Sequence, residues 1–227
     1  MTSKYLFYIT LILSIVVQFI TGAIELAAMF IKVPTAYNVL RQLLLLEVSV
    51  QVIEGLFYGW LALNFSKIQN VTPKRYIDWV ITTPTMLIIL IGYLIYLEKR
   101  STDETDDLEF FSLLKENSSV IIPVLLLNWL MLFFGYLSEM NIISPLVGIF
   151  VGFIPFLIYY YNIFTNYVSV STNGQYLFWY FFIFWSFYGF VAILPYYIKN
   201  ALYNILDLFA KNFFGLFLSY IIFTGNY

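Results

Sequence analysis

The chain has 227 residues, of which 62% are hydrophobic, 22% aromatic and 11% charged, with a formal net charge of −2. Because soluble domains carry about a quarter charged residues, this composition excludes an ordinary cytosolic enzyme, and the charge excludes a basic nucleic-acid binder. The absence of cysteine and histidine excludes disulfides and removes the commonest metal ligands, so we expect an integral membrane protein that is not an enzyme.

Hydrophobic runs long enough to cross a bilayer predict an all-α membrane protein, a seven-helix bundle that forms a single domain over residues 1–227. Polar residues, proline and glycine bound the runs. The first run is too long for a signal peptide and has no small-residue cleavage site, so we interpret it as a retained helix. The predicted helices cover residues 5–31, 42–64, 74–97, 119–138, 142–165, 175–197 and 199–223.

Two connections between these helices are longer than the others. Residues 101–119 form an acidic, solvated loop in which we expect a helical piece at residues 108–114. Residues 33–41 could form a short helix that lies flat on the bilayer surface. The lysines and arginines of the loops divide five against four between the two sides, so the positive-inside rule does not decide the topology.

Ionisable residues inside membrane helices are expensive and indicate functional sites. Asp207 and Lys211 are four residues apart, hence on one face of their helix. A buried lysine stays charged only beside an acidic partner; Asp78 and Asp207 are both available, and Arg75 can balance the second carboxylate. The alternative is a cluster of ion pairs that merely locks the helices together. The high aromatic content favours a functional role for the lysine instead. A lysine amine surrounded by flat aromatic side chains is the environment that an aldehyde chromophore bound as a Schiff base needs.

The segment RYIDWVITTP, at residues 75–84, resembles the third-helix signature RYxDWxxTTP of the microbial (type 1) rhodopsins. The segment DLFAK, at residues 207–211, is similar to their seventh-helix DxxxK, whose lysine carries retinal. The resemblance covers the whole chain and implies an extracellular N-terminus. It also implies all-trans retinal bound to Lys211 as a protonated Schiff base, with Asp78 and Asp207 as counterions and Arg75 as their charge partner.

Further retinal-pocket positions match the same family. The resemblance implies that retinal is clamped by Trp79, Thr83, Met86 and Trp185, that its ring end is flanked by Asn128, Met131 and Gly135, and that the second counterion is bonded by Tyr58 and Tyr188. One departure is Gly189, which stands where many members have a proline that kinks the sixth helix.

The position eleven residues after Asp78 is Ile89, where outward proton pumps of the family carry an acidic proton donor. Polar residues instead form stripes on three predicted helices, by the spacing of one helix face. The stripes are Ser14, Gln18 and Glu25; Glu47, Gln51 and Glu54; and Asn200, Asn204, Asp207 and Lys211, with Asn212 about 100° away. Such stripes can line a hydrated path for cations, or they can be hydrogen-bonded glue between helices.

One subset of these residues resembles the ion pathway of the viral rhodopsins of large algal viruses, in particular their first group, the viral channelrhodopsins of the Organic Lake phycodnavirus type. The subset is Ser14, Gln18, Glu47, Glu54, Asn204 and Asn212. The resemblance implies a light-gated cation channel for protons and monovalent ions, in the membrane of a virus-infected host cell.

This resemblance also bears on the gate, on the alternatives to a channel and on the oligomeric state. Glu54 should bond Ser14 and Asn212 and so close the path in the dark. A light-driven outward proton pump, as in the second group of viral rhodopsins, and a photosensor are the alternatives to a channel. The second group assembles as a pentamer, and the formation of a homo-oligomer is left open.

Overall fold

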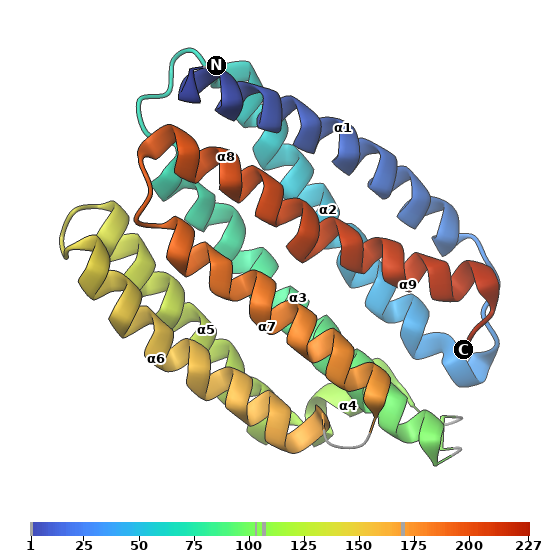
Figure 1. Ribbon diagram of the computed structural model, residues 1–227. Coiled ribbons are helices and arrows are strands. Elements are labelled where there is room, and N and C mark those ends of the chain that lie inside the picture. The colour runs from blue at the N-terminus through green and yellow to red at the C-terminus, as the bar shows by residue number, and fades with distance from the viewer. Residues whose placement is uncertain (1, 103, 106–107, 169–170) are drawn as a thin grey trace.

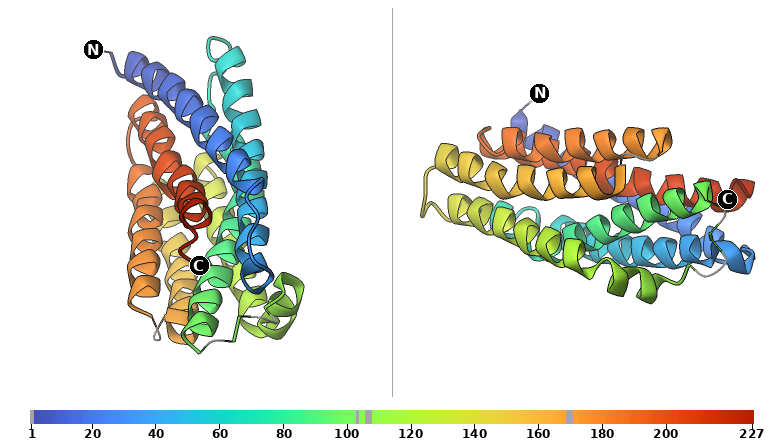
Figure 2. Two further views of the ribbon diagram at one scale, coloured as in Figure 1. Left: turned by 90° about the vertical axis from the view of Figure 1, so that its right-hand side faces the viewer. Right: turned by 90° about the horizontal axis from the view of Figure 1, so that it is seen from below.

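The computed structural model describes residues 2–102, 104–105, 108–168 and 171–227. Within these residues every regular element is helical, and the helices form seven nearly parallel rods (Figures 1 and 2). The rods are α1 (Ser3–Met29), α2 (Asn38–Asn64), α3 (Thr72–Ser101), α5 (Ser118–Glu139), α6 (Pro145–Ile163) with η2 (Phe164–Val168), α7 (Thr172–Val191), and α8 (Tyr196–Asp207) continued by η3 (Leu208–Asn212) and α9 (Phe213–Thr224). The predicted seven-helix bundle is confirmed.

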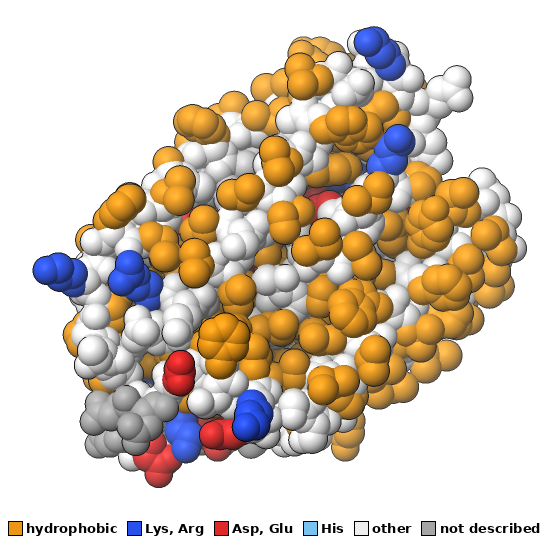
Figure 3. Space-filling model, turned by 180° about the vertical axis from the view of Figure 1, so that it is seen from behind, with side chains coloured by type: hydrophobic (Ala, Val, Ile, Leu, Met, Phe, Trp, Pro, Cys, Tyr) orange, Lys and Arg blue, Asp and Glu red, His pale blue; other side chains and the backbone are white. Residues whose placement is uncertain are grey.

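The surface of the bundle is that of a membrane protein. Six rods are long and apolar enough to cross a membrane. The remaining rod, α7, has no charged residue, but it begins with TNGQ and is rich in tyrosine and tryptophan, which lower its hydropathy. On the face drawn in Figure 3 the charged side chains lie mainly at the two ends, with a hydrophobic band between them. The chain is therefore a multi-pass integral membrane protein, and its termini lie at opposite ends of the bundle (Figure 1).

In two places the structure differs from the elements that hydropathy predicted. The sixth predicted helix ends at Val191 rather than at 197, because Pro195 disfavours helix in the residue before it and caps α8. The expected surface helix at 33–41 is wrong. Only a 3₁₀ turn, η1 (Thr35–Tyr37), precedes α2, and Val39 and Leu40 are buried in the core instead of facing lipid.

The acidic loop contains a short helix, α4 (Phe110–Glu116), close to the expected residues 108–114. Three aspartates of this loop, Asp103, Asp106 and Asp107, lie outside the described residues. Charged side chains of this region gather at one end of the face drawn in Figure 3. The described charged side chains of this loop therefore lie away from the hydrophobic band.

α3 is the central rod, and its two halves differ in chemistry. From Met86 to Leu97 nearly every side chain is buried, and all of them are apolar apart from two tyrosine hydroxyls. The first half instead buries Arg75, Asp78 and Thr82. Arg75 and Asp78 contact the last rod, so charged side chains meet between α3 and the α8–η3 junction.

Candidate functional site

Lys211 lies in η3, a π-helical turn that interrupts the last rod. Such a turn contains one more residue than an α-helical turn and disturbs the regular backbone hydrogen bonds. The hydroxyl of Tyr180, on α7, donates to the backbone carbonyl of Phe209 at 2.7 Å, and so satisfies one acceptor within the turn. The Lys211 side chain is buried and its amine reaches α3.

Three carboxylates surround the Lys211 amine. Its Nζ donates to Asp78 Oδ2 at 2.8 Å. It also lies 3.8 Å from Asp207 Oδ1, on the same helix face, and 3.7 Å from Glu54 Oε1 of α2. The structure thus brings together the lysine and the two aspartates expected around it. Glu54, which we placed in the ion pathway, is the third member of this shell.

Asp207 is held from both sides by phenol groups. Tyr58 donates to Oδ2 and Tyr188 donates to Oδ1, each at 2.7 Å. Arg75 Nη1 lies 3.4 Å from Oδ2 in a pair that is fully buried. The two tyrosines therefore occupy the positions that the resemblance implied for them.

Arg75 is itself fixed by asparagines of α8. Its Nε donates to Asn200 Oδ1 at 2.9 Å, and its Nη2 donates to Asn204 Oδ1 in a short hydrogen bond. The hydroxyl of Ser14, on α1, donates to the backbone carbonyl of Asn204 at 3.1 Å. These contacts extend the polar cluster from Asp207 toward the N-terminal end of the bundle.

The charges of this cluster balance only if one carboxyl group is neutral. Two cations, Arg75 and Lys211, face three carboxyl groups. Both oxygens of Glu54 are buried and accept no hydrogen bond from any described residue. A buried charge without hydrogen bonds is costly, so we assign the neutral, protonated form to Glu54.

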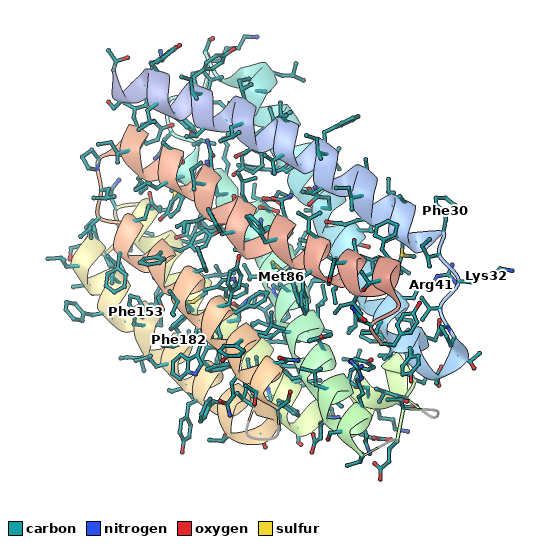
Figure 4. The ribbon with its side chains drawn as sticks, turned by 45° about the vertical axis from the view of Figure 1, so that its right-hand side comes forward. Phe30, Lys32, Arg41, Met86, Phe153 and Phe182 are labelled. Atoms are coloured by element: carbon teal, nitrogen blue, oxygen red, sulfur yellow. The ribbon has the colours of Figure 1, made fainter. Side chains whose placement is uncertain are left out.

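A cavity lies between α3, α5, α6 and α7, and Lys211 is one of the residues that line it. Its volume is about 900 Å³, including the part that is open to the surroundings of the protein. Seven of the expected pocket residues line it: Trp79, Thr83, Met86, Met131, Gly135, Trp185 and Tyr188. Figure 4 shows Met86 near the middle of the bundle, with Phe153, another lining residue, on α6. A lysine amine in the wall of a mainly apolar cavity with aromatic walls fits retinal bound through a Schiff base.

Two expected pocket residues lie behind the cavity wall. Asn128 donates to Thr83 Oγ1 at 2.8 Å and thereby ties α5 to α3. Tyr58 contacts Asp207 on the far side of Lys211. Neither residue lines the cavity, so each supports the site through a neighbouring side chain.

Several lining residues were missed by the sequence reasoning, and five of them lie on α6. Gly148, Gly152 and Phe156 are spaced by four residues and so share one helix face, a signal that could have identified them. Tyr76, one turn before Trp79, also lines the cavity. Gly189 lines it too, and α7 continues as an α-helix through this position to Val191, without the break that a proline would cause.

The expected contact of Glu54 with Ser14 and Asn212 is wrong. The amide of Asn212 donates to Gln51 Oε1 at 2.9 Å and to Thr21 Oγ1 at 3.0 Å, because Gln51 lies one turn before Glu54 on the face toward the last rod. Ser14 lies on the other side of Lys211, beside Asn204. Thr21 was missed, and its place one turn after Gln18 was the available signal.

The remaining pathway residues are buried between α1, α2 and the last rod. Gln18 accepts a hydrogen bond at its backbone carbonyl from the amide of Gln51, at 2.6 Å. Glu47, one turn before Gln51, is fully buried. Ile89, in contrast, lies in the apolar half of α3, packed among hydrophobic side chains.

Comparisons with known proteins agree with this geometry. A family model described as bacteriorhodopsin-like protein matches residues 7–225. The crystal structure of viral rhodopsin OLPVRII is similar over 99% of both chains, with 26% identity and a TM-score of 0.81. A search of curated proteins found none that matches.

Two further solved structures are similar at lower identity. The blue light-absorbing proteorhodopsin from Med12 has 19% identity over 98% of both chains and a TM-score of 0.75. Acetabularia rhodopsin I has 17% identity, covering 100% of this chain and 97% of its own, and a TM-score of 0.70. At these identities they show the fold alone. Because the family model spans nearly the whole chain, this protein belongs to the bacteriorhodopsin-like family.

Proposed function

We propose that the protein is a light-gated cation channel. In this family retinal is bound to a lysine as a Schiff base, and when bound it supplies the absorption of light and a change of shape. We assign this lysine to Lys211 and propose the all-trans isomer, a protonated Schiff base and an extracellular N-terminus. The residues described below hold the charge at Lys211 and line the path for protons and monovalent cations.

A single observation carries the proposal: buried polar side chains follow one another along the seam between α1, α2 and the last rod. We call these residues the polar seam. They are Thr10, Ser14, Gln18, Thr21 and Glu25 on α1, Glu47, Gln51 and Glu54 on α2, and Asn204, Asp207, Lys211 and Asn212 on the last rod. Polar side chains in a membrane interior that are arranged along a line are typical of an ion path, and the carboxylates select for cations.

The polar seam is closed by hydrogen bonds in this structure. Asn212 and Gln51 bond one another and both bond Thr21, which joins the three rods on one side of Lys211. On the other side, Asn204 donates to Thr10 at 3.1 Å and accepts from Arg75. A conducting state needs water between these partners, so we interpret the present arrangement as the dark, closed state.

Lys211 couples the cavity to the polar seam. Its amine faces Asp78, Asp207 and Glu54 at once, so a displacement of its side chain redistributes charge among three carboxyl groups. None of the described residues donates a hydrogen bond that would hold the Glu54 carboxyl group in place. Charge that moves toward Glu54 favours the entry of water at the level of Lys211, and this entry would open the seam.

The direct test is whole-cell photocurrent from the retinal-bound protein over a range of holding voltages. A channel current reverses near the equilibrium potential of the permeant cation, whereas a pump current keeps its direction. We expect Glu54→Gln and Asn212→Ala to change the dark leak, the ion selectivity or the closing rate, with little effect on the retinal absorption band. Ser49→Ala is the matched control, because Ser49 lies on α2 but is exposed on the outside of the bundle.

An outward proton pump is the second candidate. Glu25 and Glu47 favour it, because they are buried carboxyl groups on the opposite side of Lys211 from Arg75 and could replace the donor missing at Ile89. A current that keeps its direction against an opposing proton gradient would support the pump and reject the channel. In that case the polar seam is hydrogen-bonded glue between helices.

A further inference from the structure

Two glutamates converge where α1, α2 and α9 meet. Glu25 and Glu47 are both fully buried. A Cβ atom placed on Gly215 of α9 would lie 1.9 Å from Glu25 Oε1 and 3.1 Å from Glu47 Cγ. The two side chains therefore meet over the bare backbone of Gly215, in space that any other residue there would fill.

The four carboxyl oxygens of this pair lack partners. Among the described residues none donates a hydrogen bond to either glutamate, and neither forms an ion pair. Lys211, a buried cation of the last rod, contacts Asp78, Asp207 and Glu54 instead. The hydroxyl of Ser219 is also buried and unpartnered, and it lies one turn after Gly215 on the same buried face of α9.

Two charged carboxylates side by side, buried and without donors, are not a stable arrangement. A protonated carboxyl group has an O–H donor as well as acceptors, so two protonated groups can donate to one another. A metal cation is a poorer occupant, because hard cations take six or more oxygen ligands, and two carboxylates with one hydroxyl supply fewer. The chemistry of the site favours protons.

We propose that Glu25 and Glu47 form a proton-binding pair that is neutral in the dark, in which each carboxyl group donates its proton to the other. The Ser219 hydroxyl donates to one of the remaining oxygen lone pairs. Gly215 makes the pair possible, because its missing side chain leaves the room in which the carboxyl groups meet. This inference stands on the geometry of the pair and does not depend on whether the protein conducts ions.

Infrared spectroscopy of the dark, retinal-bound protein tests the proposal, since a protonated carboxyl group and a carboxylate have separate stretching bands. Glu25→Gln and Glu47→Gln each replace a neutral acid by an amide of similar shape. Each variant should lose one deuterium-sensitive carboxylic acid C=O band relative to the unmodified protein. Because each glutamate has its own variant, a folding failure of one leaves the other as a test.

Gly215→Ala supplies a second readout, because the new methyl group would push the Glu25 carboxyl group away from Glu47. We expect the C=O bands of the pair to shift as the mutual hydrogen bonds break. Gly55→Ala is the matched control, since nothing lies within 4 Å of a Cβ at that position. Loss of carboxylate bands in the glutamine variants would overturn the proposal. Acid bands that appear only when sodium and potassium are absent would assign the site to a cation instead.

Discussion

The two aspartates at Lys211 differ in how firmly they are held. Both oxygens of Asp207 accept hydrogen bonds from tyrosines. Asp78 accepts one at Oδ2, and its buried Oδ1 accepts none from the residues that the structure describes. A carboxyl group whose two oxygens both accept hydrogen bonds is fixed in its orientation. Asp207 is therefore held firmly by the two tyrosines, whereas Asp78 is held at one oxygen, by Lys211.

The first prediction concerns Lys211. Replacing it by alanine removes the amine at the end of the cavity, so the protein can no longer form a Schiff base. We expect Lys211→Ala to show no visible absorption band of bound retinal after retinal is added to the purified protein. Absorption spectroscopy before and after size-exclusion chromatography measures this directly.

The control for this variant is Lys99→Ala. Lys99 is exposed and pairs with Glu104 in the acidic loop, 2.7 Å away. Its removal should leave the visible band unchanged. A Lys211→Ala protein that keeps a red-shifted retinal band would show that another lysine binds the chromophore, and it would contradict the site described above.

Packing between elements depends on glycines at particular positions. α5 and α6 form a tight hairpin, in which a Cβ on Gly148 would lie 2.6 Å from the Cβ of Ser138. A Cβ atom is fixed to the backbone, so the two helices would have to separate to admit the new methyl group. Small residues permit such close approach in membrane helix pairs.

We therefore expect Gly148→Ala to destabilise the protein by about 1–3 kcal/mol, the usual cost of overpacking. Thermal unfolding followed by circular dichroism gives the measurement. Gly55→Ala, at a position with open space, should change stability by less than about 1 kcal/mol, and in the favourable direction, because alanine is the better helix former. Equal midpoints for the two variants would show that the hairpin tolerates separation.

The sequence predicted the positions of the helices better than the faces they present. The spacing of Asp207 and Lys211 placed them on one face, and the structure has them 3.8 Å apart. The expected contact of Asn212 with Glu54 came instead from the family resemblance, and the structure places Asn212 beside Gln51 and Thr21. The π turn η3 adds a residue to this segment, and nothing in the local sequence LFAKN indicates it.

At the scale of the whole molecule, hydropathy was sufficient for the fold because lipid-facing rods must satisfy their own backbone hydrogen bonds. The family motifs were sufficient to predict that Lys211, Asp78 and Asp207 lie together. The contribution of α6 to the cavity was not predictable from motifs, since Gly148, Gly152 and Phe156 carry no distinctive chemistry. The pairing of Glu25 with Glu47 needed the crossing of three rods at Gly215, which only the structure provides.

The orientation of the protein in the membrane can be tested by labelling single introduced cysteines, because the chain itself contains none. Ser66 and Ser101 are exposed at the ends of α2 and α3, on opposite sides of the membrane if each rod crosses it once. With the N-terminus outside, a membrane-impermeant maleimide applied to intact cells should label Ser66→Cys but not Ser101→Cys. Both should be labelled after lysis. The reverse pattern would place the N-terminus inside.

The π turn η3 is equivalent to the insertion of one residue into the α-helix of the last rod. Deleting Ala210 would remove the extra residue and let an uninterrupted α-helix form, so α9, with Gly215, would keep its face toward Glu25. Asp207 and Lys211 would then be three positions apart and would still share a helix face. The deletion would therefore change the direction in which the Lys211 side chain leaves the helix toward Asp78 more than its pairing with Asp207.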